Sequence, residues 1–299
     1  MSVARAVLNQ LQVPYLEKTI AQEIVTVSEV FNYLQLKQVN SIQHTYNREL
    51  TLGTLNTQLP VLPNATWTES GPTFTTVSDS LKLFGVSAYI PAMAYNDPNQ
   101  YGSIVGMKSK LIGRSIDSHI VSGSGTDPQW SGLYGSVTAS ATQQFAVATN
   151  GSGSLTLAKV DQLLSTVKGG PVSFILCTTT DKNRLINLIR GSNTQPNFIT
   201  SVNLGSGPVL TYNGVPVLVS DYISETDISM TLTNTSRMYA VRSDSMDGAT
   251  LWFNNAADLL KIREVPVNQS DLTEAQVTAK IGFSVMSSLS VACIYGING

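Results

Sequence analysis

Apolar residues recur every three or four positions in two long segments of the chain. In residues 16–39 the repeating positions are Leu16, Ile20, Ile24, Val27, Phe31 and Leu34. The second segment, residues 98–121, begins after Asp97, a favourable N-cap, with Pro98 at the first helical position, and it ends at a Ser-Gly-Ser-Gly run. This spacing predicts two helices, the second of them roughly 36 Å long at 1.5 Å per residue.

Strand-like patterns fill residues 45–90, between the two predicted helices. A run at 51–59, rich in Thr and Leu, and a second run at 66–91 are joined by a turn that contains Pro60 and Pro63. The two runs predict an extended hairpin that has few residues of its own to pack against. Because an isolated two-stranded hairpin is marginally stable in water, we expect this ribbon to need a neighbour, from this chain or from another.

The second half of the chain predicts alternating helices and strands after a segment, residues 126–153, that we expect to be mostly loop. Asn213-Gly214 is a strong hairpin signal between the strands 209–212 and 215–219. The other predicted elements are helices at 156–168 and 181–190 and strands at 172–177, 238–242, 248–253, 261–267 and 278–292. The helical and β regions are separated along the chain, so the predicted fold class is α+β.

The composition is poor in charge. Only 13% of the 299 residues are Asp, Glu, Lys or Arg, against about 25% in an average protein. This composition fits an ordinary large core, and it equally fits a surface that partners bury, because interface cores are depleted in charge. The net charge is −2 and there is no block of Lys and Arg, so no dedicated nucleic-acid-binding surface is predicted.

The sequence shows neither a membrane span nor a secretion signal. It lacks an uninterrupted run of about 18 apolar residues, and its first twenty residues lack the apolar core of a signal peptide. Cys177 and Cys293 both lie in apolar, strand-like runs. We expect both thiols to be buried and reduced, as in a cytosolic protein.

Candidate catalytic chemistry is sparse in this sequence. The two histidines, His44 and His119, have no metal-ligand spacing around them, and no His-Glu-x-x-His motif occurs. The Ser-Gly runs match neither a nucleophile elbow nor a phosphate-binding loop, and they carry no lysine of the kind that such a loop requires. We therefore predict no catalytic residue, no metal ligand and no cofactor.

Three segments, taken together in order, resemble the HK97-fold major capsid proteins of tailed bacteriophages. The segments are ATWTESGPTFTTVSDSLKLFGVSAYIP at 65–91, SGSGTDPQWSGL at 122–133, and YNGVPVLVSD at 212–221, which follows FILCT and a helix. They resemble, in turn, the extended E-loop of that family, the end of its spine helix with the loop that follows, and a strand, helix and hairpin of its A-domain. The resemblance extends over nearly the whole chain.

The resemblance implies an HK97-like layout of domains. The N-arm would be residues 1–44, the E-loop 45–92, the first part of the P-domain with the spine helix 93–149, the A-domain 150–245, and the second part of the P-domain 246–299. The N-arm begins almost at Met1, so a separate scaffolding protein, or prior processing of the chain, would be needed. There is no lysine between Glu49 and Leu81, so we do not expect the covalent lysine–asparagine cross-link of the family.

The function implied by the resemblance is structural. Copies of the chain would form hexamers and pentamers of an icosahedral shell around double-stranded DNA, with portal and scaffolding proteins as partners, in a virion assembled in the host cytoplasm. The expected intersubunit contacts are Trp67, Glu69, Phe74, Trp130 and Leu133. The alternatives are an encapsulin-type nanocompartment shell with the same fold and, from a different class, a soluble hydrolase.

Overall fold

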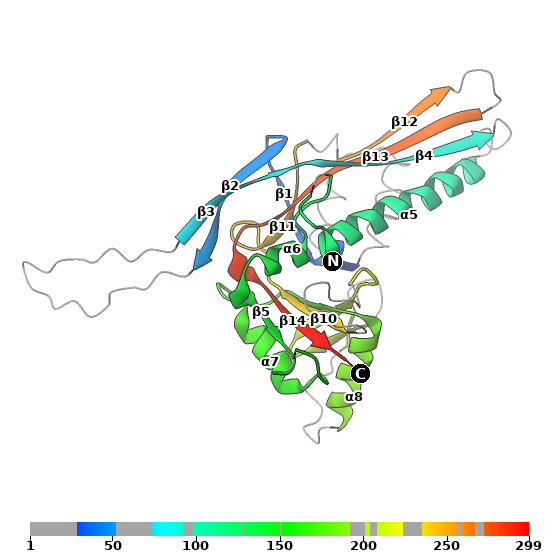
Figure 1. The fold of residues 1–299 in the computed structure, drawn as a ribbon. Helices are drawn as coiled ribbons and strands as arrows, with labels where there is room; N and C mark the ends of the chain where they lie inside the picture. Colours follow the sequence, from blue (N-terminus) through cyan, green and yellow to red (C-terminus); the bar gives the residue numbers. More distant parts are fainter. Residues whose placement is uncertain are drawn as a thin grey trace, which may run out of the picture.

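The computed structural model describes residues 29–51, 73–91, 98–126, 128–149, 151–191, 201–203, 208–223, 235–255, 259–266 and 272–298. Within these residues the strands form two larger sheets and a separate two-stranded ribbon (Figure 1). The ribbon projects to one side, and the five-stranded sheet extends away from it to the other side (Figure 1). The seven-stranded sheet lies below their meeting point in this view (Figure 1). The fold is α+β, as predicted.

The five-stranded sheet is organised around one long strand. β13 (Leu272–Val285) pairs in its first part with β4 (Lys82–Pro91) and β12 (Leu260–Pro266), and in its last part with β11 (Ala249–Phe253). β1 (Gln35–Gln38) completes the sheet by pairing in parallel with β11. A strand of 14 residues is long compared with the usual five or six. Its length allows β13 to pair with β4 and β12 at one end of the sheet and with β11 at the other end.

The long helix α5 (Pro98–Ser122) covers one face of this sheet. Burial alternates along β4, as expected for a strand with one covered face, and Phe84, Ala88 and Ile90 are its buried residues. They belong to the same hydrophobic core as Ile112 and Ile116 of α5. The predicted spine helix is therefore confirmed, and its apolar stripe packs on the sheet.

The seven-stranded sheet has the strand order β5-β14-β10-β6-β9-β8-β7. Its strands are β5 (Gln144–Ala146), β14 (Val291–Ile297), β10 (Ser236–Val241), β6 (Phe174–Cys177), β9 (Val215–Val219), β8 (Pro208–Tyr212) and β7 (Ser201–Asn203). Helices α7 (Leu157–Thr166) and α8 (Thr179–Gly191) pack against it. Both cysteine side chains are buried here and are not joined in a disulfide, as predicted.

Two elements predicted in this region, the hairpin at Asn213-Gly214 and the helix within 156–168, are observed. Asn213 and Gly214 have φ angles of 50° and 79°, the left-handed pair that a two-residue hairpin between β8 and β9 requires. Thr156 caps α7 by accepting a hydrogen bond from the Lys159 backbone N–H.

The first predicted helix ends earlier than expected. Residues 16–28 lie outside the described part of the chain, and the described remainder is helical only in α3 (Glu29–Tyr33). Residues 35–38 form β1 instead of helix, because their backbone pairs with β11, some 215 positions later in the chain. The periodicity of neighbouring side chains contains no information about so distant a partner.

Residues 126–153 are more regular than the predicted loop. They contain α6 (Leu133–Thr138), a short 3₁₀ turn and β5. The single strand predicted at 278–292 is two strands, since β13 ends at Val285 and β14 starts at Val291. Between them, Ser287 and Ser290 hydrogen-bond to the local backbone and form a turn that interrupts the ladder.

Strand pairing also differs from the expected domain layout. β14 was expected with the spine helix in residues 246–299, but it pairs with β10 in the seven-stranded sheet. β5, expected with the spine helix in 93–149, pairs with β14 in that same sheet. β4 was expected within the E-loop, residues 45–92, but it pairs with β13 over ten residues. The ribbon that remains separate comprises β2 and β3 alone.

Candidate assembly site

The two-stranded ribbon, here called the arm, is formed by β2 (Gln43–Thr51) and β3 (Thr73–Ser80). Its strands are antiparallel, with Gln43 opposite Ser80 near the body and Thr51 opposite Thr73 at the outer end. Residues 52–72, which connect the strands, lie outside the described part of the chain. Figure 1 shows the arm extending away from both larger sheets, so it has few neighbours within the subunit.

The part of one face of the arm that lies nearest the body carries no charged side chain and is largely exposed to solvent. On β2 this face carries Gln43, Thr45 and Asn47, and on β3 it carries their partners Ser80, Ser78 and Thr76. Hydroxyl and amide groups bond across the strands, with 3.0 Å between Thr45 and Ser78 and 3.1 Å from Thr76 to Asn47. These bonds hold the two strands in register without an ion pair, and they leave a flat polar surface available for contact.

Two apolar side chains near the outer end of the arm are exposed. Phe74 is 56% exposed and Leu50 is 39% exposed. Large apolar groups that project from a ribbon without cover mark a surface suited to a partner. The prediction that Phe74 contacts another subunit is thus consistent with its position, whereas Trp67 and Glu69 lie outside the described residues.

The opposite face of the arm is tied to the body near the end of β13. The Arg48 side chain donates from Nε to the Val285 carbonyl at 2.8 Å, and its Nη2 donates to the Tyr46 hydroxyl at 3.0 Å. Tyr46 in turn donates to Asp79 of β3 at 2.8 Å. Burial raises the pKa of the Tyr46 phenol far above its ordinary value, so this hydroxyl stays protonated and continues to donate.

The His44 ring packs at the root of the arm. Its ring lies 5.1 Å from the Tyr46 ring and 5.4 Å from the indole of Trp252, which is completely buried on β11. Within the described part of the chain, its Nδ1 atom is buried without a hydrogen-bond partner. Burial, followed by the charge of Lys37, lowers the pKa of His44, and Asp79 opposes this with a smaller effect. The neutral imidazole is therefore the form that suits this position.

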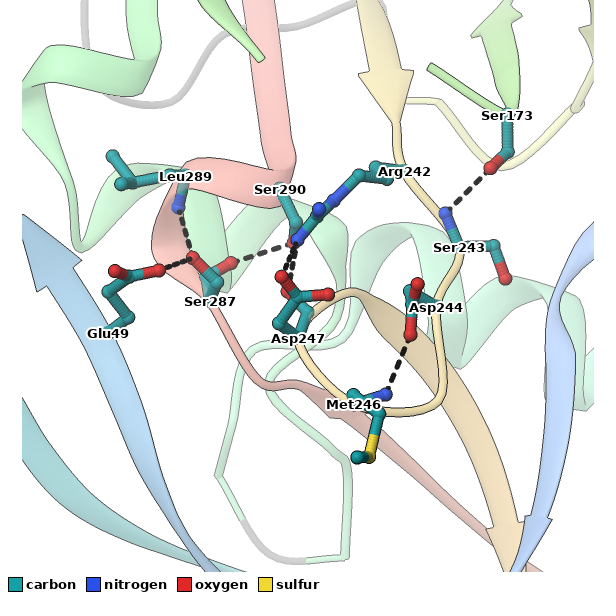
Figure 2. Close-up of polar contacts among 10 residues, drawn as sticks. All are labelled: Glu49, Ser173, Arg242, Ser243, Asp244, Met246, Asp247, Ser287, Leu289 and Ser290. Carbon is teal, nitrogen blue, oxygen red and sulfur yellow. Dashed lines mark hydrogen bonds and ion pairs between the residues drawn. The ribbon is translucent and has the colours of Figure 1, made fainter. Parts of the chain in front are cut away.

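The arm is also bonded to the turn that leads from β13 to β14 (Figure 2). The Ser287 hydroxyl donates to the Glu49 carboxylate at 3.3 Å, and the Ser288 hydroxyl donates to the Glu49 carbonyl at 3.0 Å. The Glu49 N–H donates to the Met286 carbonyl at 3.3 Å. The arm is thus anchored where the chain leaves the five-stranded sheet and enters the seven-stranded sheet.

A second crossing between the sheets lies beside the first. Residues 242–248 lead from β10 to β11, and residues 286–290 lead from β13 to β14; together they are called the junction. The Arg242 N–H donates to the Ser290 carbonyl at 2.8 Å, and the Met286 N–H donates to the Gly248 carbonyl at 3.1 Å. These backbone bonds join the two crossings into one unit that supports the root of the arm.

Arg242 is the buried charge of the junction. Its Nη2 atom lies 2.7 Å from the Asp247 carboxylate and donates to the Asp247 carbonyl at 2.9 Å (Figure 2). The guanidinium lies against Gly169, where φ is +86° and an added Cβ would come within 2.7 Å of Nη1. Glycine at this position is therefore needed both for the backbone conformation and for the space beside Arg242. Nearby, Ser173 accepts from the Ser243 N–H at 2.9 Å and Asp244 caps the turn at Met246.

Trp130 and Leu133 do not lie on an accessible surface. They are 3% and 0% exposed within the subunit, so a second subunit has almost no area of either side chain to contact. Trp130 packs among Phe84 and Phe283, with ring centroids 5.2 and 6.2 Å away. These two expected intersubunit contacts are corrected to core residues, because the end of α5 and the loop after it fold back onto the sheet.

The described residues contain no cluster of three or more His, Cys, Asp or Glu side chains that would hold a metal ion. Among the described helices, none has the length and hydropathy to cross a membrane. His119, the second histidine, contacts Phe84 and Trp130 through ring edges, and its Nδ1 lies 2.6 Å from the Ser115 carbonyl. Its contacts are those of a packed side chain, and the arm with its anchor remains the candidate site.

Comparison with known proteins finds similarity in structure only. No family model matches the chain, and no curated protein matches its sequence. Among solved structures, the holo-SrpI encapsulin complex from Synechococcus elongatus PCC 7942 matches with a TM-score of 0.66 and 15% identity, over 90% of this chain and 87% of that chain.

Two further matches have a similar extent. The capsid of the native GTA particle gives a TM-score of 0.64 at 12% identity, over 92% of this chain and 91% of that chain. A protein of Microbacterium phage Oxtober96 gives 0.61 at 13% identity, over 91% of both chains. The fold that the chain shares with these proteins over nine tenths of its length is the HK97-like fold.

Proposed function

We propose that this chain is a major capsid protein, a structural subunit that self-assembles into the hexamers and pentamers of an icosahedral shell around double-stranded DNA. The observation that carries the proposal is the arm: it projects from an HK97-like body, leaves its outer face and Phe74 exposed, and is anchored firmly at its root. A segment with this geometry gains its packing from another subunit.

The chemistry of the arm supports a protein partner. From Gln43 to Asn47 and from Thr76 to Ser80 its outer face carries no charge, so a neighbouring subunit can cover this part without removing charges from water, which is costly. Phe74 offers an aromatic side chain of the type that often anchors interfaces. Trp67 and Glu69 belong to the connecting segment of the same ribbon and are proposed as further contacts of the arm.

The remaining partners follow from the same proposal. Copies of the chain itself are the main partner, and portal and scaffolding proteins complete a virion assembled in the host cytoplasm. With a net charge of −2, the subunit would contact packaged DNA weakly, with a shallow dependence on salt. The shell protein itself would catalyse no reaction.

The likeness to the encapsulin complex supports a second candidate function. An encapsulin-type shell would use the same arm and the same body, but it would enclose protein cargo in place of a genome. The TM-scores of 0.66, 0.64 and 0.61 are too close to separate the two candidates.

Electron microscopy of the purified protein, beside size-exclusion chromatography, tests the proposal. We expect rings or closed shells of tens of nanometres when the chain is expressed alone or with a scaffolding protein. Nuclease-protected DNA inside shells made in the native host favours the capsid, and a co-purifying enzyme favours the encapsulin. A stable monomer at micromolar concentration, with no particles at any ionic strength, contradicts both.

A further inference from the structure

The turn that leads from β10 to β11 presents an apolar side chain at its tip. Met246 is 79% exposed, the largest exposed fraction among the large apolar side chains of the described residues. Figure 2 shows this side chain pointing away from Arg242, the buried charge of the junction. The other exposed large apolar side chains of the described residues lie on strands or on α5, apart from Ile42. Met246 is therefore one of two that project from a turn.

Hydrogen bonds fix the shape of residues 244–247, here called the Met246 turn. The Met246 N–H donates to the Asp244 carboxylate at 2.8 Å. Arg242 binds both the carboxylate and the carbonyl of Asp247. A turn held in this way loses little conformational freedom when a partner covers it, which favours binding.

A cavity of about 750 Å³ lies at the far end of the seven-stranded sheet, between the start of α7 and the second half of α8. It is here called the α7–α8 cavity, and its apolar walls are Leu155, Leu157 and Leu188. The volume exceeds that of a single side chain, so the tip of a turn fits inside. Methionine, unbranched and flexible, suits an irregular apolar cavity of this kind.

Polar groups line the same cavity. They include Arg184 and Asn187. Arg184 donates from Nη1 to Asp181 at 2.9 Å, and because Asp181 is completely buried it holds the guanidinium in place. A guanidinium has five N–H donors, so Arg184 can bind a second acceptor. The Asp247 carboxylate, which is 49% exposed on the Met246 turn, is an acceptor of the matching charge.

The turn and the cavity lie at opposite ends of β14. The junction, which contains the Met246 turn, ends at Ser290 where β14 begins, and Asn298 beyond the other end of β14 lines the cavity. Seven strand residues span roughly 23 Å, so the two features do not meet within one subunit. A projecting apolar group and a matching cavity on different parts of one chain join copies head to tail, and such contacts close into a ring when the rotation between copies permits.

We propose that the Met246 turn of one subunit inserts into the α7–α8 cavity of the next subunit around a ring. The leucine walls enclose the methionine, and Arg184 binds the Asp247 carboxylate. The inference rests on the proposed function, because it names a contact within the hexamers and pentamers of the shell.

Disulfide trapping tests the contact in the assembled protein. Cys177 and Cys293 are buried, so Met246→Cys and Asn187→Cys together supply one accessible thiol on the turn and one in the cavity. Under mild oxidation we expect covalent multimers up to the size of a ring on a non-reducing denaturing gel. Ile42→Cys with Asn187→Cys is the matched control, because Ile42 is 70% exposed and also lies on a turn. It should give at least about tenfold less cross-linked product.

Electron micrographs of the same samples separate this contact from the proposed function. Where rings or shells are present, equal cross-linking of the two cysteine pairs, or a disulfide within one chain, overturns the contact and leaves the proposed function standing. Samples without rings or shells contradict both.

Filling the cavity provides an independent test. Gly191 lines the cavity, and an added Cβ there would meet no atom within 4 Å, so Gly191→Leu narrows the cavity without straining the subunit. Gly102→Leu on α5 is the matched control, since an added Cβ there is equally free of contacts. Circular dichroism should show both variants folded, and we expect only Gly191→Leu to lower the yield of cross-linked multimers, by at least about tenfold. Undiminished cross-linking in Gly191→Leu would overturn the proposal.

Discussion

The arm and strand β10 are both β-structure, but they bury very different amounts of surface. All six residues of β10 are buried, and both of its edges are paired, with β6 and with β14. In β3 of the arm no residue is buried and five of the eight are exposed. β10 ends in the apolar run Met-Tyr-Ala-Val, whereas β3 is mostly Thr, Ser and Asp, so the composition of each strand matches its surroundings. Strand β10 is buried within the subunit, whereas the arm leaves exposed surface that a partner can cover.

The largest expected effect is the difference in stability loss between replacing an aromatic residue of the core and replacing an aromatic residue of the arm. Trp252 is completely buried, donates from Nε1 to Ser284 at 3.0 Å and lies against Gly282, where an added Cβ would come within 2.1 Å of the indole. Trp252→Ala should lower the free energy of unfolding of the unassembled subunit by about 3–5 kcal/mol. Phe74→Ala, measured in the same way by chemical denaturation, should change it by less than about 0.5 kcal/mol. Similar losses for the two variants would mean that the arm packs within its own subunit.

An intermediate effect is expected at the junction. Arg242 is buried, and Arg242→Met removes its bonds to the carboxylate and the carbonyl of Asp247. The free energy of unfolding should fall by about 1–3 kcal/mol, as for the loss of hydrogen bonds to a charged group.

Asp247→Asn is the matched control for Arg242→Met. The Asp247 side chain is 49% exposed, so water screens its charge and compensates for part of the lost interaction. We expect a change below about 1 kcal/mol in the same denaturation experiment. A larger loss from Asp247→Asn than from Arg242→Met would show that the carboxylate, and not the buried guanidinium, holds the junction together.

The smallest expected effect is a pH dependence at the root of the arm. Burial lowers the pKa of His44 below its ordinary value of 6.5, so the unfolded chain binds this proton more readily than the folded chain. The stability that His44 contributes is therefore fully present above pH 6.5 and is lost as the pH falls through the lowered pKa. Thermal unfolding between pH 7.5 and pH 5 should show a steeper loss for the wild type than for His44→Gln. Parallel curves for the two proteins would contradict this role.

The sequence predicted those elements whose causes are local. Asn213-Gly214 determines its hairpin because both residues adopt positive φ angles. The apolar stripe in the sequence of α5 marks the side of the helix that packs against the sheet. Two elements that depend on distant partners were not predicted. β1 exists because β11 pairs with it, and the turn at 286–290 depends on where the chain changes sheet.

The candidate site was predictable to a similar extent. A ribbon with an exposed Phe74 was predicted here, but its first strand was placed at 51–59, whereas β2 is Gln43–Thr51 and residues 52–72 lie outside the described part of the chain. The anchor of the arm was missed, because Glu49 and Ser287 are 238 positions apart and neither stands out by type. Trp130 and Leu133 were misplaced, since an aromatic residue in a Ser-Gly loop resembles a surface anchor until the loop is seen to fold onto the core.

The most direct test of the account shortens the arm and leaves its root intact. Thr51 pairs with Thr73, so Asn-Gly in place of residues 52–72 should close β2 and β3 with a two-residue hairpin turn. A Gly/Ser segment of the original length at the same place separates the effect of length from that of the side chains.

The account predicts that the shortened subunit stays folded and melts cooperatively, as circular dichroism would show, but forms no shells under the electron microscope. The Gly/Ser variant should assemble poorly as well, because it lacks Trp67 and Glu69. Normal shells from the shortened variant would contradict the claim that the arm joins subunits, and loss of the folded state would show that the connecting segment belongs to the core.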